Sequence, residues 1–192
     1  MKNIWLIRHG QHQGQIDSNA CKINPELSGL GVKQAQLLKN RISNIETDVV
    51  LISPLARASA TYALSESNSN NAKYEKRLLE YKYHCDGPNI YDASEYNMSS
   101  SIAEIDDSDH HTVVFKERIK SLIEFITKSE YESFMLFCHL GVICEFYIQF
   151  FGDNNANNPQ FEVGNTSVSN LQIAKNGTKK LCLWNDMHHL SI

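Results

Sequence analysis

Several features that would mark a specialised class of protein are scarce in this sequence. Its five cysteines are odd in number and widely spaced along 192 residues, which argues against a disulfide framework and for a reducing compartment. The adjacent pairs His110-His111 and His188-His189 lack the Cys/His spacing of a zinc site. We therefore expect neither structural disulfides nor a bound metal.

Long apolar runs and an excess of positive charge are also missing. No apolar stretch approaches the roughly 20 residues that a membrane-spanning helix needs. Met1 leads straight into an apolar strand, with no room for a secretory leader. The formal net charge of -4 gives no general attraction to nucleic acid or to anionic membranes. These absences predict a cytoplasmic protein that binds neither nucleic acid nor membrane and acts through a local pocket.

What the chain does contain is an alternation of strand and helix patterns. With 42% hydrophobic and 21% charged residues, it fits one globular domain that buries roughly 70% of its unfolded surface. An Asn176-Gly177 pair between two alternating segments predicts a C-terminal hairpin. The predicted strands are 3–7, 48–52, 73–75, 134–138, 168–173 and 180–184, and the predicted helices are 29–42 after a Ser28 cap, 113–126, 142–151 and one that begins at Ser53-Pro54.

Basic side chains follow two of the predicted strands. Arg8 and His9 come directly after the first strand, and His139 comes directly after the strand at 134–138. In open α/β sheets the carboxyl ends of the strands form the ligand crevice, while Gly10 lets the backbone turn away from it. An imidazole just before a helix lies in a field that favours anions, so we expect His139 to hold its proton. These side chains are candidate ligands of an anion; the alternative is a strand that ends in ordinary polar surface residues.

A further cation, Arg57, lies near the start of a predicted helix. Ser53 suits the cap position and Pro54 the first helical position, so free N–H groups and the helix dipole favour an anion there. A cation in the first turn opposes the dipole, which makes sense if Arg57 faces a bound anion. The alternative is an exposed arginine near a helix start.

Three other regions are open to more than one interpretation. Glu80 follows two leucines, and desolvation beside an apolar wall would raise its pKa towards the range useful for proton transfer; alternatively it is an ordinary surface glutamate. The Ser- and Asp-rich segment at about 84–111 is too long for a plain connection and is interpreted as a lid. Asp186 and His189 follow the last strand and are interpreted as surface or tail residues.

Together these pieces resemble the histidine phosphatase superfamily, the phosphoglycerate-mutase-like proteins. Each motif alone is weak, but their order and spacing match over nearly the whole chain. The matching residues are Arg8-His9-Gly10, Leu27-Ser28 to Gly31 with Gln34-Ala35, Ser53-Pro54-Leu55 with Arg57-Ala58 and Thr61, Glu80, His139 and Asn165-Thr166-Ser167-Val168-Ser169.

The resemblance implies a fold and a set of roles. The fold is α/β, a three-layer sandwich with a mostly parallel central sheet flanked by helices and a C-terminal hairpin at the sheet edge. It forms a single domain over 1–192 that includes the lid at about 84–111. No metal or cofactor is required, because arginines supply the charge neutralisation. The implied roles are His9 as the nucleophile that becomes phosphorylated, Arg8, Arg57 and His139 as ligands of the phosphate oxygens, and Glu80 as the acid that protonates the leaving oxygen.

The sequence departs from the family pattern near these residues. Gln15 stands where the family usually has Asn, and Leu140 stands where many members have the first of two glycines. Gln15 and the Leu140 N–H are therefore further candidate contacts to phosphate. After Glu80 the usual Gly and Trp-Glu-Gly run is replaced, so His84 and Asp86 are alternatives to Glu80 as proton donor.

The leading hypothesis is a metal-independent phosphatase that hydrolyses a small phosphate monoester through phospho-His9. One alternative is a phosphoglycerate-type mutase, which must keep water away from phosphohistidine; the chain is short for such a mutase and its polar lid is open, so hydrolysis is favoured. The other alternative is a non-catalytic phosphate-binding or scaffold protein that retains the pocket. Neither the substrate nor the oligomeric state can be predicted from the sequence.

Overall fold

The computed structural model describes most of the chain in one α/β arrangement. Most of the segment predicted as a lid, about 84–111, falls outside the described residues, and so does Asp86. The described residues are 1–17, 24–67, 69, 71–81, 83–85, 90–92, 102–104, 109–152 and 161–191.

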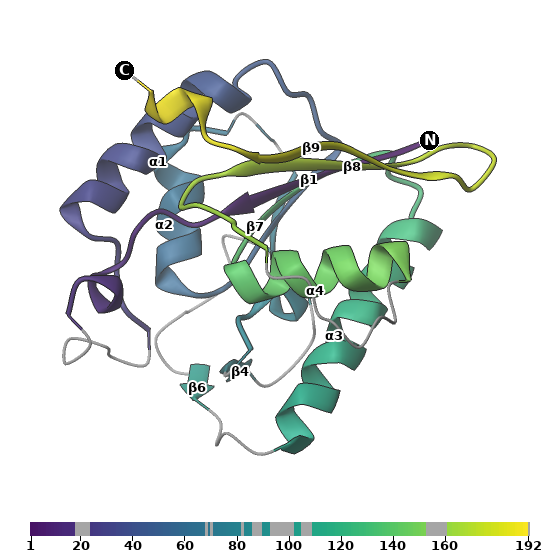
Figure 1. Ribbon diagram of the computed structural model, residues 1–192, viewed down its shortest axis with the longest axis horizontal. Helices are drawn as coiled ribbons and strands as arrows, with labels where there is room; N and C mark the ends of the chain where they lie inside the picture. The colour runs from purple at the N-terminus through teal and green to yellow at the C-terminus, as the bar shows by residue number, and fades with distance from the viewer. Residues whose placement is uncertain are drawn as a thin grey trace.

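A seven-stranded sheet forms the centre of the molecule (Figure 1). Its strand order is β5-β3-β2-β7-β1-β8-β9, and the four strands from β3 to β1 are mutually parallel. The hairpin of β8 and β9 is antiparallel and forms one edge, as predicted. The strand bounds are β1 Lys2–Arg8, β2 Val49–Ile52, β3 Ala72–Glu75, β5 Ile90–Asp92, β7 Ser133–Cys138, β8 Val168–Ile173 and β9 Lys179–Asp186, with β4 Tyr83–Cys85 and β6 Ile102–Glu104 paired separately.

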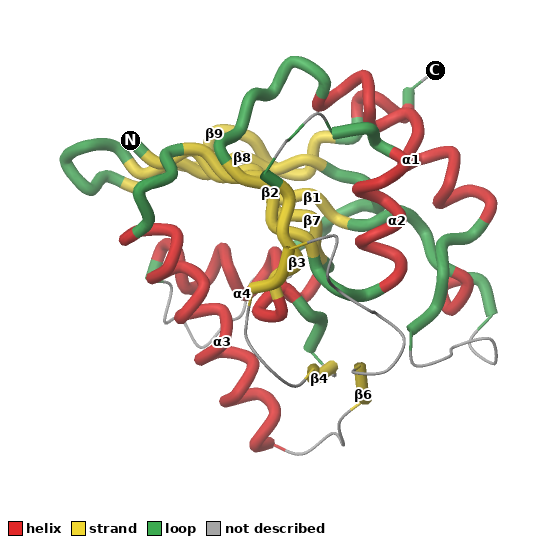
Figure 2. The backbone as a smooth tube through the Cα atoms, turned by 180° about the vertical axis from the view of Figure 1, so that it is seen from behind, coloured by secondary structure: helices red, strands yellow, loops and turns green. Residues whose placement is uncertain are grey.

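Helices cover both faces of this sheet. Helices α1 (Gly29–Ile42) and α2 (Ala56–Leu64) lie on one side of the strands, and α3 (Asp109–Lys128) and α4 (Leu140–Phe151) lie on the other (Figure 2). The predicted three-layer sandwich is therefore confirmed. Shorter 3-10 turns, η1 (Gln13–Gln15), η3 (Lys76–Leu78) and η4 (His188–Leu190), complete the described elements.

Strand β7 shows why the core has two halves. Its alternate residues Phe134, Leu136 and Cys138 pack with the cluster under α3 and α4, whereas Met135 and Phe137 pack with the cluster under α1. All five are buried. A strand covered on both faces is apolar throughout rather than alternating, which is typical of the centre of a parallel sheet.

Two predicted helix starts are wrong by two residues. Helix α2 begins at Ala56 rather than at Ser53-Pro54. The Ser53 N–H continues the sheet by donating to the Phe137 carbonyl at 2.9 Å. The Ser53 hydroxyl lies 2.7 Å from His139 Nε2 and accepts only a long hydrogen bond, 3.4 Å, from the Leu55 N–H, so Ser53 belongs to the strand end rather than to the helix cap. Helix α4 begins at Leu140 rather than at 142, with His139 in the cap position.

The first helix begins where predicted and buries one face. The Ser28 hydroxyl accepts from the Gly31 N–H at 3.0 Å, which confirms the cap. Leu30, in its first turn, points away from the core and is 51% exposed. The buried positions are Gly31, Ala35, Leu38 and Ile42, because small residues allow α1 to approach its neighbours closely.

The C-terminal residues are part of the packed structure rather than a tail. The η4 turn lies over α1, where Figure 1 shows it in yellow. Asp186 forms an ion pair with Arg41 of α1 at 2.6 Å, and His189 is buried. The interpretation of Asp186 and His189 as surface or tail residues is therefore wrong.

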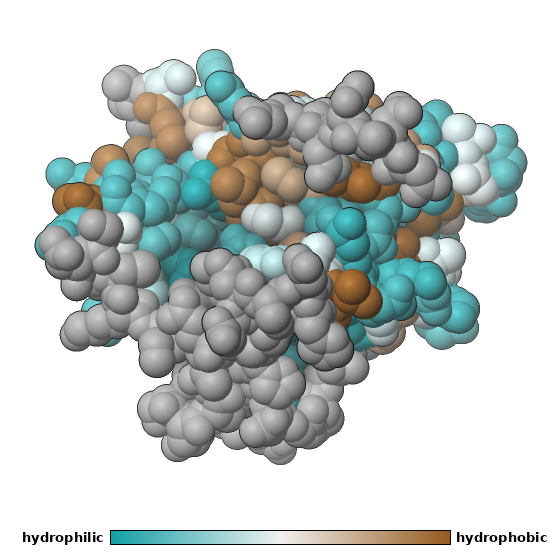
Figure 3. Space-filling model, turned by 60° about the horizontal axis from the view of Figure 1, so that its bottom comes forward, coloured by the Kyte–Doolittle hydropathy of each residue, from teal (hydrophilic) through white to brown (hydrophobic). Residues whose placement is uncertain are grey.

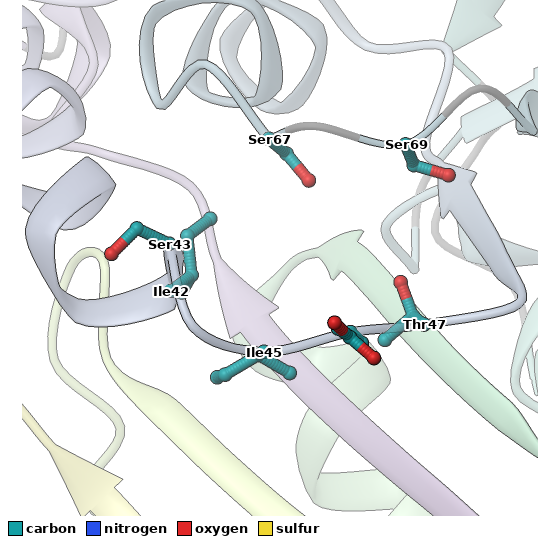
Figure 4. Close-up of a pocket in the computed structure, with 7 residues that line it drawn as sticks. Ile42, Ser43, Ile45, Thr47, Ser67 and Ser69 are labelled. Carbon is teal, nitrogen blue, oxygen red and sulfur yellow. The ribbon is translucent and has the colours of Figure 1, made fainter.

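The described surface carries hydrophobic and hydrophilic areas and one polar cavity. Figure 3 shows a hydrophobic patch near the middle of one face, bordered by hydrophilic residues. A cavity of about 330 Å³ lies at the amino end of β2, between the end of α1 and the segment after α2, and is lined by Ile42, Ser43, Ile45, Glu46, Thr47, Ser67 and Ser69 (Figure 4). None of the described helices is long and apolar enough to cross a membrane.

Candidate active site

The two histidines predicted at strand ends meet at the carboxyl edge of the sheet. Strands β1 and β7 are parallel neighbours, and the His9 N–H donates to the Cys138 carbonyl at 3.0 Å, so pairing continues one residue beyond β1. The His9 and His139 rings lie with their centroids 5.1 Å apart. Adjacent parallel strands that end together thus place both imidazoles in one site.

The hydrogen bonds of His9 fix its tautomer. Nδ1 lies 2.7 Å from the Gly10 carbonyl, which can only accept, so Nδ1 carries the hydrogen. Nε2 accepts a hydrogen bond from the Arg57 Nε–H at 3.3 Å and therefore holds the lone pair. Nε2 is the ring atom of His9 that is available as a nucleophile.

Arg57 reaches this site from the first turn of α2. Its carbonyl accepts from the Thr61 hydroxyl at 2.7 Å, and the same hydroxyl oxygen accepts from the Gly10 N–H at 2.9 Å. Thr61 thus ties the start of α2 to the loop after β1. Arg57 and His9 are each only 3% exposed, so the alternative of an exposed surface arginine is wrong.

Arg8 and Glu80 complete one side of the site. Arg8 donates from Nη1 to the Val163 carbonyl. Burial lowers the pKa of Arg8, and the negative charge of Glu80 opposes that shift. The Glu80 carboxylate accepts from the Tyr81 N–H at 3.0 Å through Oε1 and from the Gly141 N–H at 3.2 Å through Oε2. The Glu80 carboxylate is therefore held at the start of α4 by Gly141, which lies two residues after His139 in the chain.

The two further candidates lie at the edge of the site. Gln15 exchanges side-chain hydrogen bonds with Asn165 at 3.2 and 3.3 Å, and the Asn165 amide also donates to the His9 carbonyl at 3.0 Å. Leu140, the first residue of α4, is 36% exposed. Of the alternatives to Glu80, His84 belongs to β4, but its side chain and all of Asp86 lie outside the described residues.

Comparison with known proteins decides the family. The profile of the histidine phosphatase superfamily (branch 1) matches residues 4–187, which is nearly the whole chain. The chain belongs to this superfamily. The resemblance inferred from the motifs is confirmed, and with it the class of enzyme, a phosphoric monoester hydrolase of the histidine phosphatase type.

Relatives of this histidine phosphatase carry several substrate names. A Hydrogenobacter thermophilus protein provisionally named phosphoserine phosphatase 2 is 24% identical over 160 residues, 74% of this chain and 75% of the relative. The adenosylcobalamin/alpha-ribazole phosphatase of Escherichia coli is 40% identical over 62 residues, 32% of this chain and 30% of the relative. A phosphoserine phosphatase structure from Entamoeba histolytica has a TM-score of 0.72 at 17% identity, covering 99% of this chain and 100% of that one; this likeness shows the fold.

The electrostatics of the histidine phosphatase site keep its imidazoles neutral. Burial lowers the pKa of His9 well below 6.5, and the charge of Arg57 lowers it further. Burial and Arg57 likewise lower the pKa of His139, so the expectation that the helix start holds its proton is wrong. The positive end of the α4 dipole disfavours an imidazolium, and only a bound anion would reverse that.

The sequence analysis missed one histidine of this site. The His12 ring lies 5.4 Å from the His9 ring, and burial together with Arg57 and Arg8 lowers the pKa of His12 to about 4. His12 is held by a bridge to Leu27 and by a hydrogen bond from its N–H to Gln15 Oε1 at 3.1 Å. Its position three residues after His9, just beyond the strand end, was the available signal.

The neutral histidines predict a loss of stability in mild acid. An unfolded histidine binds a proton near pH 6.5, whereas folded His12 does so only near pH 4, so the unfolded state binds more protons between these values. Stability should be constant above about pH 6.5 and fall as the pH drops towards 4. Urea unfolding midpoints at a series of pH values measure this fall.

A matched pair of variants makes the pH test specific. His12→Asn should make the fall in the urea midpoint smaller, because one neutral buried imidazole is gone. His188→Asn, which replaces an exposed histidine, should leave the fall unchanged. A midpoint independent of pH between 7.5 and 4.5 in the unmodified protein would contradict the assignment of neutral histidines.

Proposed function

We propose that this protein hydrolyses a small phosphate monoester through a phosphohistidine formed at Nε2 of His9. The observation that carries the proposal is the orientation of His9, whose lone pair lies against Arg57 with the His139 ring 5.1 Å away. Two guanidinium groups and two imidazoles in one buried site suit a phosphoryl group, which carries up to two negative charges on three oxygens.

The chemistry follows from these groups. A phosphate oxygen replaces His9 Nε2 as the acceptor of the Arg57 Nε–H, which frees the lone pair. Nε2 then attacks phosphorus, the bond to the ester oxygen breaks, and the leaving oxygen takes the proton of Glu80. In the second step Glu80 accepts a proton from water, the resulting oxygen bonds to phosphorus, and the bond to Nε2 breaks. Inorganic phosphate and the original His9 and protonated Glu80 are restored.

Arg8 and His139 have supporting roles in this proposal. Arg8 adds a second planar guanidinium group that can donate two hydrogen bonds to the phosphate oxygens, and its hydrogen bond to the Val163 carbonyl orients that group. His139 is held by Ser53 at 2.7 Å and donates to the phosphoryl group once the dianion has raised its pKa. Gln15 and the Leu140 N–H stay predictions as edge contacts of the same group.

The substrate class rests on the relatives rather than on a feature of the pocket. Proteins named for phosphoserine and for alpha-ribazole phosphate are similar to this chain, so small phosphoesters are the first to assay. We also infer a single domain over 1–192 that includes a lid at about 84–111, and a cytoplasmic location. A panel of phosphoserine, alpha-ribazole phosphate, sugar phosphates, nucleotides and phosphopeptides, with His9→Ala as the blank, ranks the candidates.

The covalent intermediate gives the decisive test. Brief incubation with a phosphoester labelled in its phosphoryl group, followed by an alkaline quench, should leave acid-labile label on the protein. His9→Ala should carry no label, whereas His188→Ala, a variant of an exposed histidine, should be labelled as strongly as the unmodified protein. Label that persists in His9→Ala would assign the nucleophile to another residue. Phosphate binding without turnover of any phosphoester would instead support a non-catalytic protein.

A further inference from the structure

The loop before β8 forms hydrogen bonds with Arg8, the last residue of β1, and with His9, the residue after it. This loop, residues 163–167, accepts a hydrogen bond from Arg8 at the Val163 carbonyl. The Thr166 N–H donates to the His9 carbonyl at 3.3 Å, and the Arg8 N–H donates to the Ser167 carbonyl at 3.2 Å. The placement of Arg8 and His9 therefore depends on the conformation of this loop.

Thr166 holds an unfavourable backbone conformation at the centre of the loop. Its φ is 56°, in the left-handed region that β-branched residues rarely adopt. Thr166 is fully buried, and its hydroxyl donates to the Asn165 carbonyl at 2.7 Å. A strained residue of this kind persists only where its surroundings fix it.

His189 is the group that fixes Thr166. Its Nε2 lies 3.0 Å from the Thr166 hydroxyl oxygen, whose own hydrogen is already used by Asn165. The hydroxyl oxygen therefore accepts, and Nε2 of His189 carries the hydrogen and donates. A chain of hydrogen bonds runs from His189 through Thr166 to the backbone of His9.

Other residues near His189 restrain the same loop. Asn185 accepts from the Gly164 N–H at 2.7 Å through its side-chain oxygen. Just beyond the loop, the Asn185 N–H donates to the hydroxyl of Ser169 in β8 at 3.0 Å. The Met187 side chain packs so closely against Gly164 that a Cβ there would overlap its sulfur. The segment 185–189 thus contacts the loop at three points, and its contact with Thr166 is the one that continues to His9.

We propose that His189 is a positioning residue for phosphoryl transfer, acting through Thr166 on the backbone of His9. The inference rests on the proposed function, because it assigns His189 to the His9 reaction. This role accounts for the burial of His189 against loop 163–167, although His189 is far in the sequence from the proposed phosphate ligands.

The test compares turnover and binding in variants of His189. His189→Ala should lower kcat for p-nitrophenyl phosphate about tenfold and leave KM within about twofold, because His9 loses its alignment while Arg57 and His139, which the loop does not hold, still bind the phosphate. His189→Gln should recover most of the kcat, since its amide N–H can donate to Thr166. His188→Ala, in the neighbouring exposed residue, should match the unmodified protein.

Thr166→Gly shows whether the effect passes through Thr166. Glycine adopts the positive φ without strain and offers no hydroxyl, so adding His189→Ala to Thr166→Gly should lower kcat no further. An His189→Ala variant that unfolds at lower temperature but keeps the kcat of the unmodified protein would overturn the inference and leave the proposed function intact. An unmodified protein that neither turns over the aryl phosphate nor acquires label on His9 would overturn both.

Discussion

Arg57→Ala should lower kcat/KM for any phosphate monoester by about 10³-fold, the order of effect of an arginine that stabilises a transferring phosphoryl group. Arg57 is buried, touches Nε2 of His9 and lowers the pKa of His9, His12 and His139. Its loss would remove a proposed phosphate ligand and also make His9 easier to protonate. The acid limb of the pH profile of kcat/KM should therefore move to higher pH.

A lysine at position 57 distinguishes the effect of the positive charge from that of the planar guanidinium group. Arg57→Lys keeps a cation near His9 but loses the planar fork and the Nε–H, so it should hold the acid limb near its original pH and recover only part of kcat/KM. Lys33→Ala, which removes an exposed cation from α1, should change neither quantity. Retention of kcat/KM within tenfold in Arg57→Ala would mean that other residues hold the phosphate.

Gly141→Ala should lower kcat by about 10²-fold or more, the usual contribution of a general acid. A Cβ at position 141 would overlap the Glu80 carboxylate, which now accepts the Gly141 N–H. The carboxylate would have to leave the start of α4, and the leaving oxygen would lose its proton source. Steady-state kinetics with an alkyl phosphate, whose leaving group needs protonation, measures the loss.

Two comparisons link this loss to Glu80. Gly29→Ala changes a glycine at the start of α1 with no atom within 4 Å of the new Cβ, so it should leave kcat unchanged. Glu80→Gln should lose as much kcat as Gly141→Ala, and combining the two should lose little more. Full activity of Glu80→Gln would mean that His84 or Asp86, rather than Glu80, protonates the leaving oxygen.

The positions of the main site residues were predictable because they depend on local signals. Apolar runs define β1 and β7, so Arg8 at the end of β1 and the histidines directly after the two strands, His9 and His139, must lie at the carboxyl edge of a parallel sheet. The three-layer arrangement was implied by the family resemblance, and the alternation of strands and helices agrees with it. The family motifs then supplied the expected roles.

The features that were missed depend on tertiary contacts. Ser53 looks like a helix cap, but its N–H is used by the sheet and its hydroxyl by His139. The sign of the His139 pKa shift depends on burial and on Arg57, which the strand-end pattern does not show. His189 looked like part of a tail because nothing near it in the sequence indicates its contact with Thr166.

The central place of β1 has a consequence for synthesis of the protein. Asn3 pairs with Ser133 of β7, and Lys2 pairs with Ile173 of β8, so β1 is flanked by two strands that come much later in the chain. At a translation rate of about 5–20 residues per second, this apolar strand waits on the order of ten seconds for its partners. During that interval its apolar side chains and unpaired backbone groups are exposed, a condition that generally favours aggregation and chaperone binding.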